Sequence, residues 1–149
     1  MQTLLTIATI LNALIAGAAL DKAVIGLPAR RKIGVHAFAN YFRATDLGPG
    51  RFWYPVFGLG GPLLTIASTM MAFVRGVASL LLLAAAFFAL LHIIATANAA
   101  PNGLKLKNSS LSEESIYSIL KRFSAWNAVR AIALLGTFLC SLFALIGSD

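Results

Sequence analysis

Four long apolar stretches alternate with polar segments along the chain. They cover residues 3–20, 53–73, 77–97 and 126–146. Each of the last three has 21 residues, and an α-helix of that length rises about 31 Å, which matches the hydrocarbon thickness of a bilayer. The first is shorter but still within the range of a membrane span. The pattern predicts an all-α, integral membrane four-helix bundle, with residues 1–149 forming a single transmembrane domain.

The connections between these stretches differ in length. Only "VRG" separates the second stretch from the third, which predicts a tight hairpin that turns at Arg75 and Gly76. The other two connections, residues 21–52 and 98–125, are long and fall on one face of a four-span bundle. In the second of them, "SLSEESIYSILKRFSAW" has apolar residues at helical spacing. We expect an amphipathic helix there that lies along the membrane surface and leads into the fourth span.

Two shorter patterns add local expectations. In the first long connection, "GVHAFANYFRATD" favours a short helix that ends at "LGPG". The glycines of "FGLGGP" lie inside the second span, where small residues let helices approach closely. Residues 3–20 resemble a signal peptide in hydrophobicity, but no positively charged residue precedes them. We therefore expect a retained first transmembrane helix.

The charge distribution predicts how the chain sits in the membrane. Hydrophobic residues make up 59% of the chain and charged residues 11%, against about 25% charged in soluble proteins. A net charge of +7 raises nucleic acid as a partner, but ten of the twelve Lys and Arg residues lie in the two long connections and only Arg75 lies at the other face. By the positive-inside rule, we expect both long loops to be cytoplasmic and both termini to be outside. Because this rule accounts for the basic residues, we expect no nucleic acid as a partner.

Cysteine and histidine usage limits the possible chemistry. Cys140 is the only cysteine, which excludes an internal disulfide and mechanisms that need a cysteine pair. The only histidines are His36 and His92, and no carboxylate lies inside a predicted span. This is a poor ligand set for a metal, so we expect neither a metal site nor a cofactor.

Polar side chains gather at the predicted cytoplasmic end of the spans. They are Asp21 after the first span, Tyr54 in the second, His92 and Thr96 in the third, and Trp126, Asn127 and Arg130 in the fourth. His92 and Thr96 are four residues apart and share a helical face, as do Asn127 and Arg130, which are three apart. In an antiparallel bundle these two faces can meet. The sequence therefore predicts a pocket at this mouth with apolar walls, a cation, an imidazole, amides and a phenol.

Two residues in this cluster have competing interpretations. Arg130 can extend its side chain to the membrane interface, or it can face the bundle and pair with Asp21, Asp46 or an anionic ligand. Asn127 on the same face favours the second interpretation. His92 is a hydrogen-bonded structural residue, a general base or substrate contact, or, as the least favoured alternative, a metal or haem ligand.

Several segments of the chain resemble one known family. The segments "AGAALDKAVIGLPARRKIG", "YFRATDLGPGRFWYP", "ATANAAP" and "RFSAWNAVRA" are similar to the anthrone oxygenase-like family of small four-span membrane proteins. The resemblance extends over nearly the whole chain, and it implies a bacterial inner membrane. It implies functional positions around the same end of the bundle. These are Asp21, Pro28, Arg43, Asp46, Thr96, Pro101, Trp126 and Arg130.

The resemblance also implies a reaction. An anthrone has an acidic methylene, and the carbanion left by proton removal can react with O2 without a cofactor. His92 or Asp46 would serve as the base, and Arg130 would stabilise the anion. The hydrophobic aromatic or quinone-like ligand would contact Asp21, Arg43, Tyr54, Thr96, Trp126 and Asn127.

Two other functions fit the same sequence. A small four-span protein can be an accessory or structural subunit of a larger membrane complex, or can form a homo-oligomer within the bilayer. Arg130 is then a packing or ion-pair residue. A small transporter is less favoured, because proton-coupled exporters need a carboxylate inside the membrane.

Overall fold

The computed structural model describes residues 2–147, and these residues form helices and short connections without a strand. The elements are α1 (Gln2–Asp21), the π-helical segment η1 (Lys22–Gly26), α2 (Leu27–Ile33), α3 (Val35–Thr45), α4 (Gly50–Val74), α5 (Leu80–Lys105) and α6 (Glu113–Ile146). Four helical runs among the described residues are long and apolar enough to cross a membrane: α1 with its continuation through η1 and α2, and then α4, α5 and α6. The predicted all-α four-helix bundle is confirmed.

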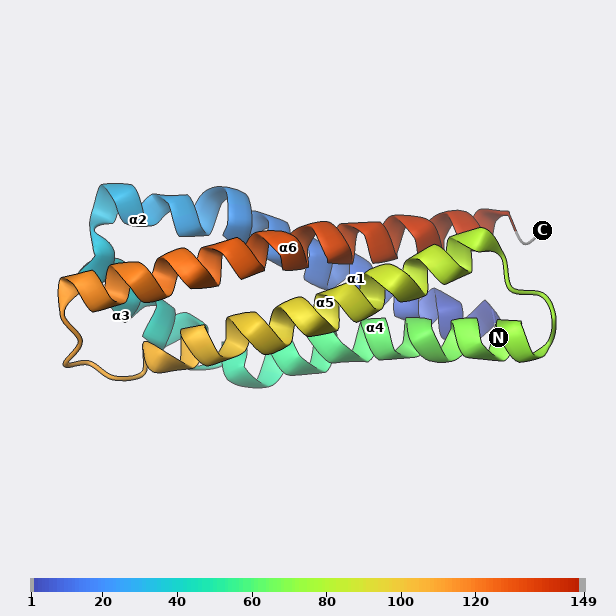
Figure 1. Ribbon diagram of the computed structural model, residues 1–149, viewed down its shortest axis with the longest axis horizontal. Coiled ribbons are helices and arrows are strands. Elements are labelled where there is room, and N and C mark those ends of the chain that lie inside the picture. Colours follow the sequence, from blue (N-terminus) through green and yellow to red (C-terminus); the bar gives the residue numbers. More distant parts are fainter. Residues whose placement is uncertain (1, 148–149) are drawn as a thin grey trace.

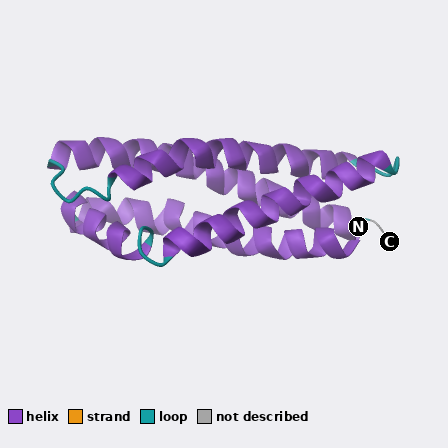
Figure 2. Ribbon diagram, turned by 90° about the horizontal axis from the view of Figure 1, so that it is seen from below, coloured by secondary structure: helices purple, strands orange, loops and turns teal. Residues whose placement is uncertain are grey.

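The four long helices form a ring in which neighbours run antiparallel (Figure 1). Helix α1 packs between α4 and α6, and α5 closes the ring by packing against the same two helices. Both chain ends lie at one end of the bundle, beside the α4–α5 turn (Figures 1 and 2). The short helices α2 and α3 and the α5–α6 connection lie at the other end, which we call the mouth end. The two long connections therefore share one end, and the prediction that this end is cytoplasmic still rests on the charges.

Helix α6 is longer than the fourth apolar stretch. It runs unbroken for 34 residues, and the Ser112 side chain caps its start by accepting a hydrogen bond from the Ser115 backbone N–H. The predicted amphipathic helix is thus present, but its expected place along the membrane surface is wrong. It forms the first turns of α6 and continues the bundle.

The reason for this difference is a hydrophobic cluster at the mouth end, which we call the cap core. Its members come from α2, α3, α5, the connection after it and α6, and include Leu27, Phe38, Phe42, Leu106, Ile116, Ile119, Leu120 and Phe123. The apolar face of the amphipathic segment is buried there against protein. Burying these apolar side chains stabilises the extended helix.

Close packing joins α1 to α4 in the middle of the bundle. The Asn12 side-chain N–H donates a 2.8 Å hydrogen bond to the Thr65 hydroxyl. A Cβ atom at Gly61 would lie only 2.6 Å from Asn12 Oδ1 and 3.1 Å from its backbone nitrogen. The predicted role of this glycine in helix packing is therefore confirmed.

We expect Gly61→Ala to destabilise the bundle by about 1–3 kcal/mol, because the added methyl forces α1 and α4 apart. Gly17→Ala is the matched control, since a Cβ at Gly17 meets nothing within 4 Å. Thermal unfolding of both variants in the same detergent measures the effect. Equal midpoints for the two variants would contradict the close approach.

The sidedness can be tested by cysteine labelling in a Cys140→Ala background. We expect a Ser109→Cys variant in whole cells to react with a membrane-impermeant maleimide only after permeabilisation. A Val77→Cys variant should react from outside, because residue 77 is in the α4–α5 turn and exposed. The opposite pattern would invert the proposed orientation.

Candidate functional site

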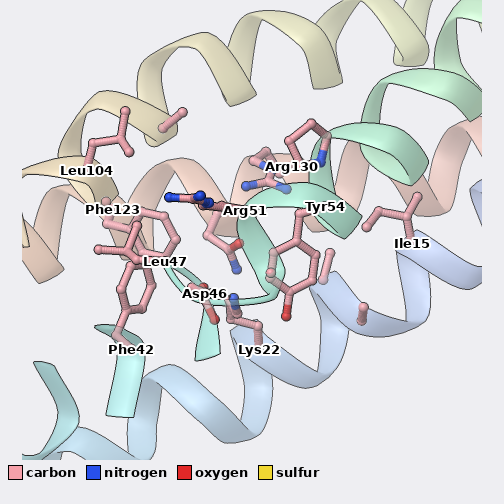
Figure 3. A pocket seen from close by; sticks show the side chains of 17 residues that line it. Ile15, Lys22, Phe42, Asp46, Leu47, Arg51, Tyr54, Leu104, Phe123 and Arg130 are labelled. Carbon is pink, nitrogen blue, oxygen red and sulfur yellow. Dashed lines mark hydrogen bonds and ion pairs between the residues drawn. The ribbon is translucent and has the colours of Figure 1, made fainter. Parts of the chain in front are cut away.

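A cavity of about 260 Å³ lies at the mouth end, between the cap core and the membrane-spanning part of the bundle. This volume approaches the lower end of small-molecule sites, about 300 Å³. Most of its wall is apolar and comes from α1, α3, α4, α5, α6 and the connection after α3. The apolar side chains around it include Ile15, Phe42, Leu47, Leu104 and Phe123 (Figure 3).

One side of the cavity carries a partly buried ion pair. Lys22 Nζ pairs with Asp46 Oδ2, and the two side chains are only 20% and 10% exposed. The ammonium also lies 4.5 Å from the centre of the Tyr54 ring and 5.5 Å from that of Phe42. The other carboxylate oxygen of Asp46 lies 3.2 Å from the Thr45 hydroxyl. The carboxylate is therefore fixed in orientation at the edge of an apolar space (Figure 3).

Helix α6 contributes two N–H donors to the opposite side. Asn127 and Arg130 are three residues apart, so both project into the cavity from one face of α6. Asn127 is 1% exposed. Its Nδ2 atom and the Nε atom of Arg130 are buried and have no hydrogen-bond partner within the described chain. A buried donor without an acceptor is costly, so this wall is suited to a ligand that brings an acceptor oxygen.

The pairing predicted between Arg130 and Asp21 or Asp46 does not form. Within residues 2–147 the Asp46 carboxylate pairs with Lys22 instead, and Asp21 does not line the cavity. The Asp46 charge still acts on the guanidinium through space. The cavity holds three cations, Lys22, Arg51 and Arg130, against one carboxylate. This excess of positive charge favours a ligand with an anionic group.

His92 has a structural environment. It is fully buried, and its Nε2–H donates a 2.8 Å hydrogen bond to the Gly58 carbonyl. That carbonyl lacks its usual helical partner because Pro62, four residues later, has no N–H. The Thr96 hydroxyl lies 3.3 Å from the same nitrogen. His92 therefore satisfies a carbonyl that a proline leaves free, and it lies beside Arg130 without lining the cavity.

The remaining predicted site residues lie around the cavity and not in it. Arg43 donates hydrogen bonds to the Leu106 and Asn108 carbonyls, at 2.6 and 2.9 Å, and so ties α3 to the α5–α6 connection. Trp126 packs against the cap core. Of the nine residues predicted from sequence, four line the cavity: Asp46, Tyr54, Asn127 and Arg130. The five that do not are Asp21, Arg43, His92, Thr96 and Trp126.

Lys22 is the main residue that the sequence analysis missed, because it was counted only as a loop charge. The signal was present in the spacing. Ile15, Ala19 and Lys22 are four and three residues apart, so they lie on one helical face if the first helix continues beyond residue 20. The structure has that continuation, and all three residues line the cavity.

Comparisons with protein-family models, with curated proteins and with solved structures found no match. The resemblance to anthrone oxygenase-like proteins therefore stays a prediction. No group of three or more His, Cys, Asp or Glu side chains arranged to hold a metal occurs among the described residues.

A double-mutant cycle tests the role of His92. We expect His92→Leu to destabilise the protein by about 1–3 kcal/mol, because the Gly58 carbonyl is left without a donor. Pro62→Ala restores a backbone N–H to that carbonyl. The cost of His92→Leu should therefore be smaller in the Pro62→Ala background, by about 1 kcal/mol. Unfolding in detergent provides all four free energies, and strictly additive effects would contradict this assignment.

Proposed function

We propose that this membrane protein binds a flat, apolar molecule with an enolisable carbonyl at the mouth-end cavity and oxygenates it without a cofactor. Anthrone-like polycyclic aromatic compounds are the proposed substrates. The observation that carries the proposal is that Asn127 and Arg130, whose Nδ2 and Nε donors are buried without a partner in the described chain, line the same apolar cavity as the Asp46 carboxylate. We place the protein in a bacterial inner membrane with the mouth end in the cytoplasm.

The shape and lining of the cavity favour an aromatic ligand. Lys22 and Arg130 are among the charged residues that line it, while Phe42, Tyr54 and Phe123 supply aromatic surface. Aromatic rings pack favourably against such side chains, either offset or edge to face. The ligand oxygen then accepts hydrogen bonds from Arg130 Nε and Asn127 Nδ2, which satisfies both donors. A hydrophobic substrate can partition into the bilayer before it enters.

The proposed reaction begins with proton removal. Asp46 takes a proton from the acidic methylene, and the negative charge that develops on the carbonyl oxygen is stabilised by the Arg130 and Asn127 donors. The carbanion adds O2 to give a peroxide, which regains the proton from Asp46. Loss of the second methylene hydrogen breaks the O–O bond. One oxygen atom becomes the new ketone, and the other leaves as water with the two methylene hydrogens.

Position favours Asp46 over His92 as the base. Asp46 lines the cavity, whereas the Nε2–H of His92 is committed to the Gly58 carbonyl. Lys22 supports this role by holding the Asp46 carboxylate in place at the cavity wall. Thr96 and His92 then act by holding α4 and α5 together behind the cavity.

We expect Arg130→Met to lower turnover of a supplied anthrone by about 10²–10³-fold, the usual effect of removing one donor to a developing oxyanion. Asn127→Leu should act in the same direction. The matched control is Arg122→Met, which removes a charge from an exposed position of α6. Quinone formation in lipid nanodiscs is measured above the rate in empty nanodiscs, since anthrones also oxidise spontaneously. Equal rates for wild type and Arg130→Met would refute the proposal.

Native mass spectrometry of the gently solubilised protein tests binding without any assumption about the reaction. A small aromatic adduct that disappears in Arg130→Met supports the ligand site. Stoichiometric association with larger proteins and no small adduct would instead identify an accessory subunit. In that case Arg130 is a structural charge.

A further inference from the structure

The oxygenation proposed above leaves one reactive group in the cavity unused. The Lys22 amine borders the apolar space, its side chain is 20% exposed, and it lies beside the Asp46 carboxylate and over the Tyr54 ring. A primary amine in such surroundings is a nucleophile toward carbonyl compounds. In an oxygenase it would serve only to hold Asp46 in place.

We propose that Lys22 forms an imine with apolar aldehydes that enter the mouth-end cavity, so that the site binds such compounds covalently and reversibly. The inference uses the same cavity as the proposed function, but it does not require oxygenation. It assigns a ligand class, apolar aromatic or polyene aldehydes, and a point of attachment, Lys22 Nζ.

Three features of the cavity support this chemistry. First, the Lys22 side chain is only 20% exposed and borders an apolar space, and desolvation in an apolar pocket activates a lysine amine as a nucleophile. Second, the Asp46 carboxylate touches the amine and can accept its proton. Third, the wall has room for an apolar body but few polar groups to compete for the aldehyde.

The reaction balances with the groups present. Lys22 transfers a proton to Asp46, and the free amine attacks the aldehyde carbon to give a carbinolamine. Asp46 returns the proton to the carbinolamine hydroxyl, which leaves as water. The product is a protonated imine whose positive charge stays beside the Asp46 carboxylate. The Tyr54 and Phe42 rings that now contact the ammonium can stabilise this cation in the same way.

Position distinguishes Lys22 from the other lysines. Lys32, Lys105, Lys107 and Lys121 are exposed, and none of them lines the cavity. An exposed amine is largely protonated at neutral pH and has no enclosed apolar wall to hold an aldehyde. Reaction with a low concentration of an apolar aldehyde should therefore select Lys22.

The test uses the full-length protein in nanodiscs, 2-naphthaldehyde as the probe, and cyanoborohydride to trap the imine. We expect one adduct per chain, heavier by the aldehyde less one oxygen, that peptide mapping places on Lys22. Lys22→Arg should remove this adduct, because arginine keeps the charge beside Asp46 but forms no imine. Lys105→Arg is the matched control and should leave the adduct on Lys22 unchanged. Asp46→Asn should slow its formation by about a hundredfold.

The wild-type measurement is decisive even if a variant fails to fold. Labelling of Lys22 no faster than labelling of Lys105 overturns the proposal, as does an adduct that persists in full after Lys22→Arg. Anthrone turnover by the same preparation separates the two ideas. Turnover without an adduct on Lys22 refutes only the imine, whereas an adduct on Lys22 without turnover refutes only the oxygenation.

Discussion

The structure depends on one constraint, which is that a polar group inside an apolar bundle must find its partner within the protein. The bundle meets it with specific pairs. Asn12 bonds to Thr65, and His92 bonds to the carbonyl that Pro62 leaves free. Six buried side-chain atoms of the described residues lack a partner, and the donors of Asn127 and Arg130 are the informative ones, because these two residues line a cavity. Where the constraint is unmet beside an open apolar space, a ligand is the simplest partner.

The parts of the fold that follow from hydrophobic pattern alone could be predicted. Length and apolarity gave the four spans, and the short "VRG" connection gave the hairpin, where Gly76 has a φ of +71°. The mouth end could be predicted only in part. An amphipathic pattern shows that a helix has one apolar face, but not whether lipid or protein covers it. In α6 that face is covered by the other members of the cap core, among them residues of α2 and α3, which are distant in the sequence.

The candidate site was predictable for residues whose depth and helical face decide their place, such as Asn127 and Arg130. It was not predictable for residues whose place depends on a partner that is distant in the sequence. Lys22 and Asp46 are 24 residues apart, and nothing local in either segment shows that they meet. In the sequence, Arg43 cannot be told apart from a cation that binds a ligand. In the structure its guanidinium donates hydrogen bonds to backbone carbonyls of the α5–α6 connection. His92 donates to a carbonyl that Pro62 of another helix leaves free. This relation between two helices exists only in the folded structure.

The Lys22–Asp46 pair is where the stability and the chemistry of this protein meet. A buried ion pair adds little net stability compared with apolar residues of similar size, although removing one partner is costly. This partly buried pair is therefore poorly explained by stability alone, and it borders a cavity with two further cations. In that setting Asp46 is placed to take a proton either from a substrate in the cavity or from Lys22, and the second transfer frees the Lys22 amine to attack a carbonyl. The pair is therefore best understood as a functional unit of the cavity.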